Sequence, residues 1–122
     1  MGRFKVYHGT GNYALNDLLS GKPIKTRKGY VAKPCFSTTL DFSIASLFAT
    51  RKTSTADFLK GIISGVVVEY ELGGVDGKDY QRANDPCLQD EKEIAVFSVN
   101  CLKPLAVWRR SIQGEWQQEK IA

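Results

Sequence analysis

Hydrophobic positions along the chain fall into short segments with the two-residue period of β-strands. The clearest is segment 65–72, where three consecutive valines precede Tyr70 and Leu72, because β-branched and aromatic residues favour strands. Shorter segments with similar patterns predict four more strands, at residues 4–8, 35–38, 93–99 and 102–109.

Apolar residues at helical spacing lie between these strands. Residues 42–50 form the best-defined predicted helix, and Asp41 is placed to cap its N-terminus. Residues 13–19 and 56–63 predict a second short helix and a helical turn. Polar stretches predict two loops and a tail, at residues 22–34, 73–89 and 114–122. Short strands mixed with two or three short helices indicate an α+β fold.

The composition is that of a single globular domain, spanning residues 1–122, with 43% hydrophobic and 25% charged residues. No apolar run approaches the roughly 20 residues of a membrane span, and no apolar leader follows Met1, so we expect a cytoplasmic protein without a membrane partner. Three cysteines without a secretion signal predict free thiols, and one histidine without paired cysteines predicts no metal site. The net charge of +4 permits a nucleic-acid partner but is also ordinary for a soluble protein.

The first candidate site is His8-Gly9-Thr10, at the end of the first predicted strand. Glycine lets a ligand approach the backbone, and a neutral imidazole can hydrogen-bond a ribose hydroxyl. A histidine at a strand end is more often a structural or surface residue, so this segment alone does not establish a nucleotide site.

The second candidate site is Phe36-Ser37-Thr38-Thr39, together with the helix that follows it. Hydroxyl groups at a strand end can orient a neighbouring carboxylate, and an aromatic side chain on the next helix, Phe48, can stack on a flat ring. A simpler interpretation is that Ser-Thr-Thr before Asp41 is a helix-capping sequence and that Phe48 belongs to the core.

The third candidate site is Glu91-Lys92-Glu93, directly before the apolar strand that starts at Ile94. Since alternate side chains of a strand share a face, Glu91 and Glu93 can point at one site. Glu93 can hold a ribose hydroxyl and offset positive charge on a sugar, an effect typically worth ~3–4 kcal/mol. Glu91 can accept a proton from a nucleophile. The alternative is a charged, solvated loop end.

By order and spacing, the three sites resemble the scattered motifs of the ADP-ribosyltransferase superfamily, over roughly residues 4–107. Tyr7-His8-Gly9-Thr10 is similar to the His-Gly-Ser/Thr step of the poly(ADP-ribose) polymerase-like branch, and Phe48 falls where that branch carries a stacking tyrosine. Ser37-Thr38-Thr39 is similar to the Ser-Thr-Ser step of the bacterial toxin branch. Glu91-Lys92-Glu93 is similar to the Glu-x-Glu step of arginine-modifying toxins.

The resemblance implies a split β-sandwich that takes NAD+ as co-substrate in the cleft between its sheets. His8 would bind the adenosine-side ribose, the Gly9 backbone the nicotinamide amide, and Thr10 would support His8 or the ribose. Glu93 would be the catalytic glutamate. The remaining cofactor-binding residues are Phe36, Ser37, Thr38 and Phe48, among which Ser37 would position Glu93.

The activity implied is mono-ADP-ribosylation of a macromolecule. Glu91 favours protein arginine as the acceptor, and the loop 79–92 would contact it. Nucleic acid is the next candidate, because clustered basic residues could bind phosphates; these are Lys22, Lys25, Arg27, Lys28, Arg51 and Lys52. As a toxin or effector, the chain would act in the cell that makes it or be delivered by other proteins, with an antitoxin or immunity protein as partner.

The chain also departs from the family pattern. It combines motifs of two branches, so neither branch's acceptor preference transfers directly. Gln89-Asp90-Glu91 fits a Gln-x-Glu step in a shifted register, although the apolar strand begins after Glu93. Three alternatives remain: an inactive module that binds NAD or ADP-ribose, an RNA 2′-phosphotransferase-like enzyme, which the single histidine disfavours, and an unrelated α+β domain.

Overall fold

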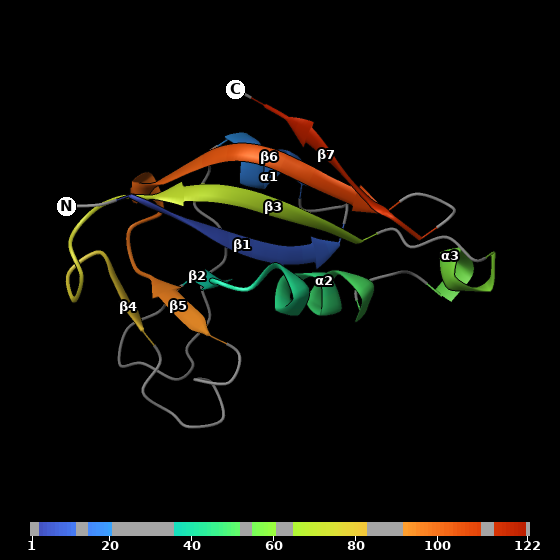
Figure 1. The fold of residues 1–122 in the computed structure, drawn as a ribbon, viewed down its shortest axis with the longest axis horizontal. Helices are drawn as coiled ribbons and strands as arrows, with labels where there is room; N and C mark the ends of the chain where they lie inside the picture. The colour runs from blue at the N-terminus through green and yellow to red at the C-terminus, as the bar shows by residue number, and fades with distance from the viewer. Residues whose placement is uncertain are drawn as a thin grey trace.

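The computed structural model describes residues 3–11, 15–20, 36–51, 55–60, 65–82, 92–110 and 114–121. The strands are β1 (Phe4–Gly11), β2 (Phe36–Thr39), β3 (Gly65–Leu72), β4 (Tyr80–Arg82), β5 (Glu93–Val96), β6 (Leu102–Arg110) and β7 (Trp116–Lys120). The helices are α1 (Leu15–Ser20), α2 (Phe42–Arg51), α3 (Thr55–Leu59) and the short 3-10 helix η2 (Val99–Cys101). The strands form one sheet of order β4-β5-β2-β1-β3-β6-β7 with antiparallel neighbours, so the predicted α+β class is confirmed (Figure 1).

Two strands lie where the sequence predicted loop or tail. β7 was predicted as part of a polar tail, yet it pairs with β6 along its length. It is an edge strand whose residues after Trp116 are exposed, so it lacks the alternation that marks a half-buried strand. β4 lies inside the predicted loop 73–89 and has only three residues, too few for a period to be recognised. Predicted loop 22–34 lies outside the described residues.

The sheet separates two layers of packing. On one face, Leu15 and Leu18 of α1 pack into the main core. The strand residues of that core are Val6, Phe36, Val66, Val68, Tyr70, Leu72, Ile94, Val96 and Val107. On the other face, Ala45 and Ala49 of α2 pack on Val67. Figure 1 shows α1 behind the β3–β6 part of the sheet and α2 beside the end of β1.

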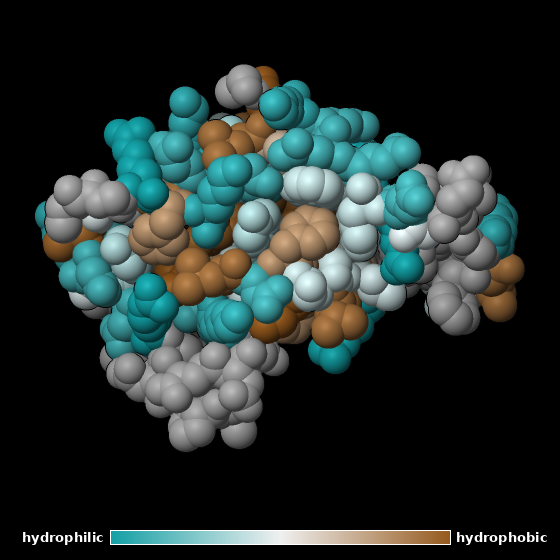
Figure 2. Space-filling view, viewed as in Figure 1, coloured by the Kyte–Doolittle hydropathy of each residue, from teal (hydrophilic) through white to brown (hydrophobic). Residues whose placement is uncertain are grey.

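The face opposite α1 carries a cluster of aromatic rings beside α2. The Phe42 ring makes edge-to-face contacts with the rings of Tyr7, Trp108 and Trp116, at centroid distances of 5.5, 4.9 and 5.8 Å. Such pairs add to the stabilisation that apolar burial supplies. In Figure 2, hydrophobic and pale side chains gather over the middle of this face, inside a hydrophilic border. The cluster anchors the first turn of α2 to the sheet.

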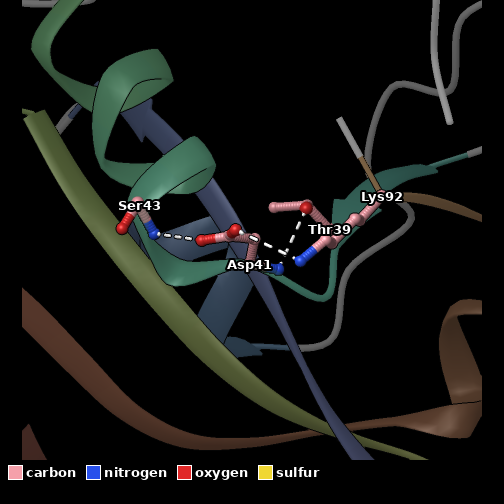
Figure 3. Close-up of polar contacts among 4 residues, drawn as sticks. All are labelled: Thr39, Asp41, Ser43 and Lys92. Atoms are coloured by element: carbon pink, nitrogen blue, oxygen red, sulfur yellow. Dashed lines mark hydrogen bonds and ion pairs between the residues drawn. The ribbon is translucent and has the colours of Figure 1, made fainter. Parts of the chain in front are cut away.

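Asp41 caps α2, as the sequence predicts. Its Oδ1 accepts a hydrogen bond from the Ser43 backbone N–H at 2.8 Å, and its own N–H donates to Thr39 Oγ1 at 3.1 Å (Figure 3). Asp41 Oδ2 also lies 3.7 Å from Lys92 Nζ, and the Leu40 N–H donates to the Lys92 carbonyl. This network joins the start of α2 to the residue before β5.

We expect Asp41→Ala to destabilise the fold by about 1 kcal/mol, because the first turn of α2 loses its cap. Asp41→Asn keeps a side-chain acceptor and loses only the exposed ion pair with Lys92, so it should lose less. Urea unfolding of both variants measures the difference. Equal losses would show that the charge of Asp41, and not its cap, stabilises this corner.

Asp79 gives the turn after β3 a pH-dependent stability. Its Oδ2 accepts a hydrogen bond from the Val75 N–H at 2.8 Å, and this bond lowers the pKa of the carboxyl below its usual value of 3.8, with smaller lowering contributions from Ser98 and Lys78. A carboxyl with a depressed folded-state pKa stabilises the fold above its unfolded pKa. That stabilisation is lost as the pH falls through the folded-state value.

Asp79→Asn should therefore destabilise the protein at about pH 7 and have a smaller effect at about pH 2.5, where the native carboxyl is also becoming neutral. Thermal unfolding of both proteins at both pH values tests this. A loss of the same size at both pH values would contradict the assigned role of the charge.

Candidate active site

The site lies where β1 and β2 part. β1 pairs with β3 from Phe4 to Gly11, but its described pairing with β2 is limited to Tyr7 opposite Thr39. Continued antiparallel pairing would next place His8 opposite Thr38, and then Gly9 opposite Ser37. At this point the His8 imidazole meets β2 instead, with Nδ1 2.6 Å from the Ser37 carbonyl oxygen. A side chain thus occupies the position where a ladder pair would continue.

The contact with Ser37 determines the tautomer of His8. A carbonyl oxygen only accepts, so Nδ1 carries the proton and donates it to Ser37. In the neutral ring, Nε2 is then the acceptor, a group suited to a hydroxyl. The Phe36 ring lies 4.2 Å from the imidazole, centroid to centroid, and tilts 36° from it. Because Phe36 is only 2% exposed, it supports His8 from the core side.

Glu93 reaches the same residue from β5. It is 5% exposed, and its Oε1 accepts a hydrogen bond from Ser37 Oγ at 2.5 Å. The contact is diagonal, since Ser37 pairs with Ala95 and Glu93 with Thr39. Ser37 therefore contacts both groups, with its backbone carbonyl on His8 and its hydroxyl on Glu93.

The extended backbone of β5 begins at Glu93. The preceding residue, Lys92, has φ 50°, a left-handed conformation that is uncommon for residues other than glycine. Strand alternation therefore does not extend back through Lys92, and it cannot place Glu91 on the face of Glu93. Glu91 and Gln89 lie outside the described residues, and their roles remain predictions.

The other predicted site residues are not all gathered at this point. Thr38 is buried on the opposite face from the Ser37 hydroxyl, and its Oγ1 donates to the Ile94 carbonyl at 2.9 Å, a bond within the sheet. Thr10 is buried on the α1 face and pairs with Val66. Phe48 is half-buried on α2, with the Arg51 guanidinium over its ring at 5.7 Å.

Gly9 has a structural reason to be glycine that the sequence did not reveal. A Cβ at this position would lie 1.9 Å from the Ala45 carbonyl oxygen, so α2 occupies the space beside its Cα. The close approach is that of a helix, not of a ligand. The role of the Gly9 backbone toward nicotinamide remains a prediction.

Sequence reasoning missed a row of residues beside the site. Glu69, Tyr7, Thr39 and Glu93 are consecutive Cα partners across β3, β1, β2 and β5. Glu69 is 4% exposed; its Oε1 accepts from Trp108 Nε1 at 3.0 Å, and its Oε2 lies 3.6 Å from Lys5 Nζ. The sequence did contain one signal of this row, because Glu69 is a carboxylate inside the otherwise apolar run Val66–Tyr70.

Burial and a neighbouring carboxylate both act on the Tyr7 phenol in this row. Burial, and then the negative charge of Glu69, raise the pKa of the Tyr7 phenol above its usual value. Tyr7 therefore stays protonated at neutral pH and can act as a hydrogen-bond donor. The row thus places two buried carboxylates and a phenol on one face of the sheet.

The described residues contain no group of three or more His, Cys, Asp or Glu side chains arranged to hold a metal ion. Over the same ranges, no helix has the length and apolar character needed to cross a membrane. What the site offers is a fixed carboxylate and an oriented imidazole, joined through one serine.

No family model, curated protein or solved structure matches this chain.

Proposed function

We propose that the chain is an NAD+-dependent mono-ADP-ribosyltransferase with the split sheet of that superfamily. The observation that carries the proposal is that His8 and Glu93 both contact Ser37 at the parting of β1 and β2, at 2.6 Å from its carbonyl oxygen and 2.5 Å from its hydroxyl. The resemblance assigned these three residues to one NAD+ site, although they come from segments far apart in the chain. The limited β1–β2 pairing supports a cleft between two halves of the sheet.

Each residue has a role that follows from its contacts. Nε2 of His8 accepts a hydrogen bond from a ribose hydroxyl of NAD+. Glu93 holds the hydroxyl of the nicotinamide ribose. As the bond between the ribose and nicotinamide breaks, the sugar becomes more positive, and the carboxylate stabilises that charge. Ser37 keeps the carboxylate in place, so it does not reorganise during the reaction.

The transfer step needs a nucleophile and a base. The acceptor atom bonds to the ribose carbon that nicotinamide leaves, nicotinamide departs with the bonding electrons, and the acceptor's proton passes to a base. Glu91 is the proposed base. Protein arginine is the favoured acceptor and a nucleic-acid base the next, and we place the reaction in the cytoplasm, as expected of an intracellular toxin or effector.

Labelled NAD+, incubated with the purified protein and a whole-cell lysate, tests both the reaction and the acceptor. Glu119→Gln is a matched control, because that side chain is 65% exposed at the sheet edge. Label that protease removes identifies a protein acceptor, and label that nuclease removes identifies a nucleic acid. Absence of both label transfer and nicotinamide release would contradict the proposal.

Ser37→Ala is expected to slow nicotinamide release about tenfold, because the hydrogen bond that positions the Glu93 carboxylate is lost. Ser46→Ala removes a serine hydroxyl from the exposed side of α2 and should leave the rate unchanged. Initial rates at saturating NAD+ measure both effects. Equal rates for Ser37→Ala and wild type would exclude a positioning role for the Ser37 hydroxyl.

A further inference from the structure

The sheet face opposite α1 carries both tryptophans of the chain, Trp108 and Trp116. Together with Phe42 and Tyr7 they form the aromatic cluster described above. All four residues are half-buried, so each keeps part of its surface accessible to solvent. Figure 2 shows hydrophobic and pale side chains on the surface over the middle of this face. Aromatic residues that stay accessible together on one face are typical of an interaction surface.

Lysine side chains lie beside the aromatic cluster on the same face. Cross-strand partners point to the same face of a sheet. Strand pairing places Lys103 in one row with Lys5, across β1, β3 and β6. It places Lys120 in one row with Tyr7, across β1, β3, β6 and β7. Lys103 and Lys120 are both exposed, and neither forms an ion pair with another described residue.

The carboxylates of this face are less exposed than the cations that pair with them. The Lys5 side chain is 62% exposed, whereas that of its partner Glu69 is 5% exposed. The same holds for Arg3, at 71%, and its partner Glu71, at 32%. A ligand that approaches the face therefore meets positive charge before it meets negative charge, and the face favours an anionic partner.

We propose that this face binds single-stranded nucleic acid, with unpaired bases on the aromatic cluster and backbone phosphates on the lysines. Sheets with aromatic side chains on one face bind unpaired bases by stacking, because every base has a flat π-surface. Lysines beside such rings neutralise phosphates. A duplex hides the faces of its bases, and an acidic peptide lacks flat rings, so either would contact the lysines alone. The proposal concerns binding only and does not depend on the proposed function.

Tryptophan fluorescence reports on this face directly, because both tryptophans of the chain belong to the aromatic cluster. The probes are oligothymidylate and oligouridylate of about 12 nucleotides, a DNA duplex of that length and a polyglutamate peptide. We expect both single strands to quench the fluorescence and to bind about tenfold tighter than the duplex or the peptide. Tighter binding of oligothymidylate would identify DNA as the ligand, and tighter binding of oligouridylate would identify RNA; either supports the proposal.

The lysines are tested by the salt dependence of binding, measured between about 50 and 200 mM NaCl. Each phosphate contact on a single strand contributes about 0.7 to the slope of log affinity against log salt concentration. The double variant Lys103→Gln, Lys120→Gln should therefore lower the slope by about 1.4. Arg82→Gln is the matched control: Arg82 is also exposed, but it pairs with Ile94 and lies on the α1 face. It should leave the slope unchanged.

The aromatic cluster is tested with Trp116→Leu, which keeps Trp108 as the fluorophore. Loss of a stacked base should lower the affinity for the single strands about fivefold or more. If this variant does not fold, the lysine variant still decides, because it changes exposed side chains only.

The proposal is overturned if neither single strand quenches the fluorescence, or if the duplex or polyglutamate binds as tightly as the single strands. It is also overturned if the double lysine variant keeps the wild-type slope, or if folded Trp116→Leu binds as tightly as wild type.

Discussion

Replacing Glu93 with glutamine is expected to lower the rate of NAD+ cleavage by ~10² or more, while NAD+ affinity stays nearly unchanged. The substitution preserves shape, and the amide oxygen can still accept the hydrogen bond from Ser37. What it removes is the negative charge that stabilises the ribose as nicotinamide leaves. The loss should therefore appear in kcat and not in the Kd for NAD+.

Single-turnover kinetics of nicotinamide release, with calorimetry for binding, separate these two quantities. Glu119→Gln, the exposed carboxylate control, should match wild type in both. A Glu93→Gln protein that releases nicotinamide at the wild-type rate would remove Glu93 from the reaction. A protein that no longer binds NAD+ would make Glu93 a binding residue and not a catalytic one.

Gly65→Ala is expected to destabilise the fold by about 3 kcal/mol or more, the largest stability effect that the structure indicates. The added Cβ would lie 1.8 Å from the Ala49 carbonyl oxygen and 2.4 Å from its carbonyl carbon. Both are backbone atoms of α2, so no side-chain rotation relieves the clash, and the helix must move away from the sheet. Gly9→Ala should behave alike, because its Cβ meets the Ala45 carbonyl at 1.9 Å.

Gly73→Ala is the matched control for these variants. Its nearest neighbour would be the flexible Arg3 side chain at 3.8 Å, an ordinary van der Waals contact. Urea unfolding should show a large loss for Gly65→Ala and little change for Gly73→Ala. If Gly65→Ala unfolds at the wild-type urea concentration, α2 does not pack on β3 as described.

Much of the fold could be predicted because its signals are local. The valine run of β3 and the aspartate before α2 are signals that lie within their own segments, and both predictions are confirmed. β4 and β7 were missed because one is too short and the other too polar to show a period. Both β4 and β7 form by pairing with a neighbouring strand. Pairing depends on that neighbour as much as on the residues of the strand itself.

In the candidate site, too, the sequence predicted some features and missed others. The sequence identified His8, Ser37 and Glu93 by residue type and order, and the structure brings these three together. The sequence could not indicate that Gly9 lies against α2 or that the Thr38 hydroxyl donates to the Ile94 carbonyl. Nor could it indicate that Glu69 lies in one row with Glu93 across the sheet. These facts depend on helix placement and sheet register, which no single segment encodes.

The structure of the Glu93→Gln protein with NAD+ bound tests the central claim most directly, because intact NAD+ should persist in this slow variant. We predict that the nicotinamide ribose lies at the side chain of residue 93, with the adenosine-side ribose within hydrogen-bond distance of the His8 imidazole. NAD+ bound elsewhere, for example at the cavity of about 280 Å³ that Arg3 and Lys103 line, would contradict the account. So would a protein that binds no NAD+.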